Sequence, residues 1–78
     1  MKQSISGQVY DIIARQFNYE GEITPDMAAK DIDGWDSLGH ALLLQALEKH
    51  FDIRFELDEI FGMQTVADMV ETVIRKLA

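Results

Sequence analysis

Ser37 is the residue of this 78-residue chain whose position suggests covalent chemistry. It stands where a long acidic segment changes into a helical pattern of apolar residues. Free backbone amides and the helix dipole favour negative charge at such a point, so they would stabilise a phosphate ester on the hydroxyl. Serine at a helix start is also a common cap. Position alone therefore leaves both a modified serine and a simple cap open.

Asp36 and His40 give Ser37 neighbours that superficially look like a hydrolase triad. A nucleophilic serine needs a base aimed at its oxygen, an acid behind that base and an oxyanion site, and one helical turn of a small bundle does not supply all three. We therefore expect no catalytic residue and no enzyme activity. His40 is expected to face solvent near Ser37, and His50 to be partly covered near the helix end.

The acidic residues before Ser37 do not predict a metal site. Asp31, Asp33 and Asp36 lack the central glycine and terminal glutamate that a calcium loop needs in register. The two histidines lie too far apart along one helix to face a single metal ion. We expect these charges to be solvated.

The elements that position Ser37 begin with a helix. Ile5, Val9, Ile12, Ile13 and Phe17 recur at spacings of three and four, with Ser4 or Ser6 as the cap. Residues 18–36 lose this period and form a long loop, which must be tied down to persist in a small domain. The expected anchors are Ile23, Met27, Ile32 and Trp35, and the pair Thr24 and Pro25 is able to start one helical turn.

Three further helices follow the loop. The pattern is helical from Ser37 through Phe51, with Asp36 or Ser37 as the cap. A short helix over residues 57–61 is expected to end at Gly62 in a left-handed conformation. The last helix starts at Thr65, with Asp68 completing a capping box. The sequence thus predicts one all-α domain over residues 1–78, a small four-helix bundle of three longer helices and one short helix.

The composition excludes several classes of function. The formal net charge is -7, from 14 acidic and 7 basic residues, so the surface repels nucleic-acid phosphates and favours partners with basic patches. Cysteine is absent, so any thiol chemistry requires a thiol that is added to the chain. No segment approaches the roughly 20 apolar residues of a membrane span, and the start of the chain lacks the order of a signal peptide. We expect a monomeric cytoplasmic protein.

The run GWDSL at residues 34–38 resembles the Asp-Ser-Leu attachment motif of acyl carrier proteins. The resemblance covers nearly the whole chain, because the first helix, long loop, motif, second helix, short acidic third helix and Thr-Val-initiated fourth helix all follow the order of that family. The end of the second helix, with Ala46, Leu47, Glu48 and Phe51, also looks like the family pattern. Motif, order and length together indicate an acyl or aminoacyl carrier.

The resemblance implies a modified serine. Ser37 would accept 4'-phosphopantetheine from coenzyme A through a phosphopantetheinyl transferase, Asp36 would help to position the metal ion of that transferase, and Leu38 would lie at the contact surface around the arm. The expected partners are this transferase and the acyl-activating, acyl-transferring or condensing enzymes of a fatty-acid, polyketide or related thiotemplate pathway. The arm supplies the thiol that the chain lacks, and tethering raises the effective concentration of the bound acid.

The second helix departs from the acid-rich helix of the best-known fatty-acid carriers, since Glu48 is its single acidic residue. We therefore predict that partners dock on an apolar patch of Leu38, Ala41 and Leu42, with acids supplied by the loop and by Glu56, Asp58 and Glu59. The alternative for Leu42 is a place in the core. Trp35 is expected to pin the loop to the bundle rather than to contact cargo.

A different class of function stays open from the residues. The chain would then be an unmodified helical adaptor that binds basic or apolar surfaces, with Ser37 serving only as a helix cap. Only a carrier gains phosphopantetheine, and only a carrier loses its function while keeping its fold when Ser37 is changed to alanine.

Overall fold

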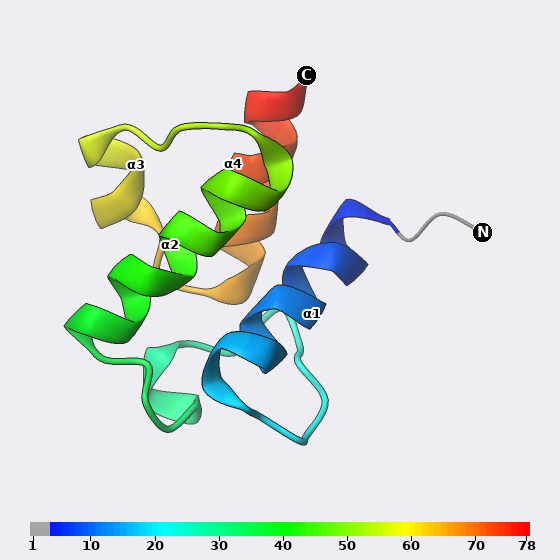
Figure 1. Ribbon diagram of the computed structural model, residues 1–78, viewed down its shortest axis with the longest axis vertical. Coiled ribbons are helices and arrows are strands. Elements are labelled where there is room, and N and C mark those ends of the chain that lie inside the picture. The colour runs from blue at the N-terminus through cyan, green and yellow to red at the C-terminus, as the bar shows by residue number, and fades with distance from the viewer. Residues whose placement is uncertain (1–3) are drawn as a thin grey trace.

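Helices make up the protein in the order that the sequence predicts (Figure 1). The computed structural model describes residues 4–78. The signal-peptide prediction concerns the segment from Met1 to Gly7, of which residues 1–3 lie outside the described residues. Within that range the chain forms no strand beyond one isolated bridge. The predicted all-α bundle is confirmed, with α1 at Ile5–Phe17, a 3-10 turn η1 at Ala29–Asp31, α2 at Ser37–Phe51, α3 at Leu57–Gly62 and α4 at Val66–Leu77.

The core lies where α1 packs against both α2 and α4. These three helices carry apolar residues at spacings of three and four, and the residues on that side are buried. The loop before α2 adds Ile23, Ile32 and Trp35 to the same cluster, with Met27 half-buried against it. The four predicted loop anchors are therefore confirmed. No helix within residues 4–78 has the length and apolar character needed to cross a membrane.

Polar side chains define where the helices start. Ser4, one of the two caps predicted for α1, accepts a hydrogen bond from the Gly7 amide at 3.1 Å. Thr65 and Asp68 form the predicted capping box of α4, in which the Asp68 amide lies 3.2 Å from the Thr65 hydroxyl oxygen. These contacts satisfy amides that have no partner inside their own helix.

The predicted left-handed end of the short helix is wrong. Gly62 is the last residue of α3, and the chain leaves through Met63 with a φ of -85°. The left-handed helix ends are instead at Asn18, with a φ of 51°, and Asp52, with a φ of 56°, which follow α1 and α2. Asn and Asp tolerate this conformation because their short polar side chains can hydrogen-bond locally.

The helical turn predicted at Thr24 is also wrong. Thr24 starts a β-turn, in which its carbonyl accepts a hydrogen bond from the Met27 amide at 3.2 Å. The single helical turn of the loop lies further along the chain, at η1. There the Asp31 carboxylate accepts a hydrogen bond from the Ala28 amide at 2.9 Å, which provides the cap that the turn requires.

The loop is fastened to the start of α4, far away in the sequence. The Val66 amide donates to the Met27 carbonyl and the Ala67 amide donates to the Pro25 carbonyl, both at 2.9 Å. Beside these bonds, residues 28 and 65 form the isolated bridge. The loop carbonyls thus take up two amides from the first turn of α4, and the loop has a fixed path into α2.

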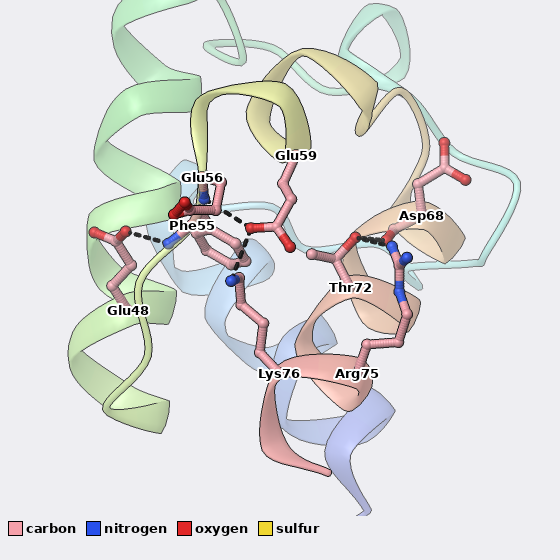
Figure 2. Close-up of polar contacts among 8 residues, drawn as sticks. All are labelled: Glu48, Phe55, Glu56, Glu59, Asp68, Thr72, Arg75 and Lys76. Atoms are coloured by element: carbon pink, nitrogen blue, oxygen red, sulfur yellow. Dashed lines mark hydrogen bonds and ion pairs between the residues drawn. The ribbon is translucent and has the colours of Figure 1, made fainter.

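Polar contacts from neighbouring elements hold α3, none of whose residues is buried (Figure 2). Glu48 of α2 accepts a hydrogen bond from the Phe55 amide at 2.9 Å. Glu59 accepts a hydrogen bond from the Glu56 amide at 2.7 Å and forms an ion pair with Lys76 of α4 at 2.8 Å. Because little apolar surface secures it, we expect α3 to open more readily than the long helices.

Candidate functional site

Ser37 is the first residue of α2, and Asp36 caps that helix. The Asp36 carboxylate accepts a hydrogen bond from the Gly39 amide at 2.8 Å, which decides between the two caps that the sequence allows. Ser37 is exposed, and within residues 4–78 no hydrogen bond to its hydroxyl is found. Because Asp36 does the capping, the Ser37 hydroxyl is free to form an ester.

Two glycines allow the loop to approach the start of α2 closely. Gly34 has a φ of 90°, a conformation that glycine adopts without a steric penalty. A Cβ on Gly39 would meet the Gly34 carbonyl oxygen and would lie 2.9 Å from the Phe17 ring. Glycine at both positions therefore keeps the turn tight and holds Ser37 directly beside the loop.

Trp35, directly before the capping residue, pins the loop as the sequence predicts. Its side chain is 7% exposed, and its ring lies 5.4 Å from the Phe17 ring of α1, centroid to centroid, at an angle of 18°. The indole N–H donates a hydrogen bond to Nδ1 of His40 at 2.9 Å. A buried indole N–H needs such an acceptor, and α2 provides it one turn after the site.

His40 is half-buried, so the prediction that it faces solvent is wrong; the indole of Trp35 draws its ring inward. Since Nδ1 accepts from Trp35, the neutral ring carries its proton on Nε2, and Ile60 of α3 lines the same groove as His40. Burial lowers the pKa of His40, and the backbone of Ile60 acts in the opposite direction. His50 is exposed rather than partly covered, with Nε2 2.9 Å from the side-chain oxygen of Gln8.

Two open grooves flank Ser37. One lies between α2 and α3 and is lined by Ala41 and Phe61 among others. The other lies towards the loop and the link between α3 and α4, where Lys30 lines it. Ser37 and His40 line both grooves and form the ridge between them. A group attached to Ser37 therefore has open surface on either side.

The predicted docking patch is exposed on α2. Leu38 is 69% exposed and Leu42 is 42% exposed, and Ala41 is exposed as well. Their spacing places them on adjoining positions of the helix surface next to Ser37. The alternative that Leu42 belongs to the core is wrong, because Leu43 and Leu44 take the buried positions. The role of the patch in docking stays a prediction.

Two exposed apolar residues on α3 were not predicted from the sequence. Leu57 is 70% exposed and Phe61 is 75% exposed. Their spacing of four on a short helix was the available signal, because it puts both side chains on one face. Phe61 lines the groove that Ser37 also lines, so α3 extends the apolar surface around the site.

The three acids predicted for docking differ in their environment. Glu56 and Asp58 are exposed, and neither has a side-chain partner among residues 4–78. Glu59 instead has internal partners, since the Glu56 amide and then the Lys76 ammonium lower the pKa of its carboxyl. Glu56 and Asp58 are therefore the acids that α3 leaves available to a partner.

Asp36 is a lone carboxylate beside Ser37. Its Oδ1 caps α2, and in the described part of the chain its Oδ2 has no hydrogen-bond partner. Across residues 4–78, no group of three or more His, Asp or Glu side chains is arranged to hold a metal ion. Asp36 could thus contribute one oxygen to a metal ion whose other ligands come from elsewhere.

Comparison with known proteins assigns the chain to a family. Residues 7–73 match the family described as phosphopantetheine attachment site, and the chain belongs to it. A holo acyl carrier protein from Geobacter metallireducens is 33% identical, with a TM-score of 0.87 over 96% of this chain and 87% of that chain.

Two further solved structures share this fold. A putative acyl carrier protein from Mycobacterium tuberculosis is 26% identical, with a TM-score of 0.86 over 92% of this chain and 97% of that chain. An acyl carrier protein from Thermotoga maritima is 25% identical, with a TM-score of 0.76 over 90% of this chain and 82% of that chain. The acyl-carrier fold is therefore common to all three.

Membership of this family establishes the class of function. The chain is a carrier protein and not an enzyme, and its prosthetic group is 4'-phosphopantetheine. Carriers of this family interact with a phosphopantetheinyl transferase and with biosynthetic enzymes. The residues at the start of α2 fit the group, because an exposed serine with a free hydroxyl stands at a helix N-terminus between two open grooves.

Proposed function

We propose that Ser37 carries 4'-phosphopantetheine and that the chain presents acyl or aminoacyl groups, held as thioesters on that arm, to the enzymes of a fatty-acid, polyketide or related thiotemplate pathway. The observation that carries this proposal is the division of roles between two adjacent residues. Asp36 caps α2, which leaves the hydroxyl of the exposed Ser37 without another role. The prosthetic group supplies the thiol that the sequence lacks.

In the attachment step, Ser37 Oγ forms the ester bond to the phosphopantetheine phosphorus of coenzyme A. The pyrophosphate P–O bond of coenzyme A breaks, adenosine 3',5'-bisphosphate leaves, and the hydroxyl proton passes to a base of the transferase. The N-terminus of α2 favours the negative charge of the phosphodiester that results. Asp36 keeps the first turn of α2 in place through Oδ1, and its Oδ2 is available to the metal ion of the transferase. Leu38, the exposed residue that directly follows Ser37, offers apolar contact to the transferase.

The partner surface combines apolar and acidic residues of α2 and α3. Leu38, Ala41 and Leu42 supply its apolar part on α2, and Glu56 and Asp58 supply the acids. Glu59 contributes less, because Lys76 already neutralises it. This arrangement favours partner enzymes with an apolar contact surface and a basic rim, which would recognise the acids electrostatically.

The test is the intact mass of the protein after incubation with coenzyme A, Mg2+ and a broad-specificity phosphopantetheinyl transferase. Wild type is expected to gain one phosphopantetheine, and Ser37→Ala to gain none while its circular dichroism spectrum is unchanged. Modification of Ser37→Ala would place the arm on another residue. No modification of wild type, under conditions that modify a control carrier, would favour the unmodified helical adaptor, which could use the exposed apolar residues of α3.

The remaining features of the proposed carrier are a single domain over residues 1–78, a monomeric state and a cytoplasmic location. They stay predictions from the composition and the helix pattern. Sedimentation velocity checks the oligomeric state directly, since the exposed patch around Leu42 is the surface through which weak self-association would occur.

A further inference from the structure

His40 occupies a central place beside Ser37. It lies one turn along α2 and lines both grooves that flank Ser37. On the loop side, Nδ1 accepts a hydrogen bond from Trp35 at 2.9 Å, with the two rings inclined by 17° and their centroids 6.1 Å apart. On the α3 side, His40 lines a groove together with Ile60 and Phe61. The imidazole thus ties α2 to the loop and borders α3.

We propose that His40 is a positioning residue for the modification site: its neutral ring holds the Trp35 indole, and protonation releases the indole. The consequence of this proposal for phosphopantetheine transfer rests on Ser37 being the attachment site. The switch itself does not, because it concerns contacts within the unmodified protein.

The chemistry of the ring makes the two contacts respond differently to acid. An imidazolium carries N–H groups on both nitrogens and accepts no hydrogen bond. Two donors, Nδ1–H and the Trp35 indole N–H, would then face each other across a 2.9 Å gap. Nε2 carries a proton in both states. The change is therefore expected on the loop side, where the indole loses its partner and the groove beside Ser37 loosens.

Charged groups near the ring come from three places. Lys30 of η1 and Asp36 line the loop-side groove, and Glu48 of α2 lines the groove towards α3. The residues of α3 and of the link to α4 that line the two grooves with His40 are Ile60, Phe61, Met63 and Gln64, which are all uncharged. Phe17 of α1 reaches the ring only through Trp35. A test must therefore separate His40 from Asp36 and Glu48.

The direction of the pH effect follows from burial. Because burial lowers the pKa of His40 from its ordinary value of 6.5, the unfolded chain binds the proton more readily than the folded protein. The stability that the neutral ring contributes is complete above about pH 6.5, and it declines as the pH falls from there to the lowered value. The release of Trp35 is thus expected in mildly acidic solution and not at neutral pH.

Trp35 is the single tryptophan of the chain, so it reports directly on this contact. The experiment follows the fluorescence of the unmodified protein from about pH 8 to about pH 5, a range that covers histidine titration. Wild type is expected to show a step with a midpoint below 6.5. His40→Asn, whose side-chain oxygen can accept from the indole but does not titrate, is expected to lack the step. His50→Gln is the matched control and should retain it.

A second measurement needs no variant. In wild type, the single indole N–H resonance and the imidazole C–H resonance of His40 should shift with the same midpoint in NMR spectra recorded over the same pH range. A wild-type indole signal that does not change while His40 titrates would overturn the proposal. So would a fluorescence step that persists unchanged in His40→Asn, because a group other than His40 would then be its cause.

The functional consequence is read from the rate of phosphopantetheine addition. The ratio of the wild-type rate to the His40→Asn rate cancels the pH dependence of the transferase itself. This ratio is expected to fall in acid with the midpoint seen by fluorescence. If this rate ratio does not change with pH while the fluorescence step is normal, His40 holds Trp35 but does not affect the modification of Ser37. That result would contradict the positioning role. Failure of Ser37 to be modified at all would leave the fluorescence and NMR results standing.

Discussion

The α-carbon of Gly39, in the first turn of α2, lies against the carbonyl oxygen of Gly34 in the loop. This approach is possible only because residue 39 has no side chain, and it brings the loop and the helix together on either side of Ser37. Gly34 contributes its positive φ of 90° to the same turn. The geometry of the site therefore depends on two residues that carry no functional group.

Gly39→Ala tests this dependence. The added methyl would collide with backbone, which cannot move aside as a flexible side chain can, so we expect a loss of about 1–3 kcal/mol in the free energy of unfolding. Gly62→Ala is the matched control, because a Cβ there meets nothing within 4 Å. This control should be neutral or stabilising by up to about 1 kcal/mol. Urea denaturation measures both, and equal stability of the two variants would contradict the tight approach.

Asp36 combines two roles that substitution can separate. Asn caps helices as well as Asp does, so Asp36→Asn should keep the stability of wild type, whereas Asp36→Ala should lose about 1 kcal/mol. If the Asp36 carboxylate also positions the metal ion of the transferase, both variants should be modified slowly. Thermal denaturation and intact mass over time give the two readouts. Rapid modification of a stable Asp36→Asn variant would remove the metal-positioning role.

Leu42 and Leu44 form a matched pair on α2. Leu42 is 42% exposed and Leu44 is 5% exposed, so Leu44→Ala should lose about 2–5 kcal/mol of stability and Leu42→Ala much less. If Leu42 belongs to the docking patch, Leu42→Ala should raise the KM of the transferase or of a loading enzyme. A drop of several degrees in Tm with unchanged partner kinetics would refute the patch.

The Glu59 carboxyl links the stability of α3 to pH. Its pKa is lowered from the ordinary 4.5 by the Glu56 amide and by Lys76, so its contribution is complete above about pH 4.5 and is lost as the pH falls through the lowered value. The protection factors of the α3 amides, which correct for the intrinsic pH dependence of hydrogen exchange, should therefore fall below that pH in wild type. Glu59→Gln should show faster exchange at neutral pH and a weaker dependence on acid. Identical pH profiles for the two proteins would exclude this contact as the cause.

The helix pattern and the motif were predictable because they depend on neighbours in the sequence. Apolar spacing predicted the three long helices, and the Thr65 and Asp68 capping box could be identified from its two residues alone. The resemblance to acyl carrier proteins also followed from local residues around Ser37, and the match over residues 7–73 confirms the family.

The failed predictions for Gly62 and Thr24 concern local backbone, whereas the one for His40 concerns a contact between distant segments. The inward position of His40 follows from the buried indole of Trp35, whose place depends on α1 through Phe17. The docking role of Glu59 stays a prediction, and its ion pair with Lys76 on α4 is a further contact between distant segments. No periodicity reports which side chain will meet a charge or a donor from another helix. The exposure of Leu42 was left open for the same reason, since the partners of α2 decide which leucines are covered.

The bonds from the Val66 and Ala67 amides to loop carbonyls have a consequence for the order of events during synthesis. A ribosome that has just produced the Ser37 motif has not yet made the segment that fastens the preceding loop, so the emerging chain presents the serine on an untethered loop. We expect the transferase to act on completed chains after their release. Intact-mass analysis of ribosome-stalled chains would show the arm missing from those that end before residue 65, and its presence there would mean that the enzyme reads the short motif alone.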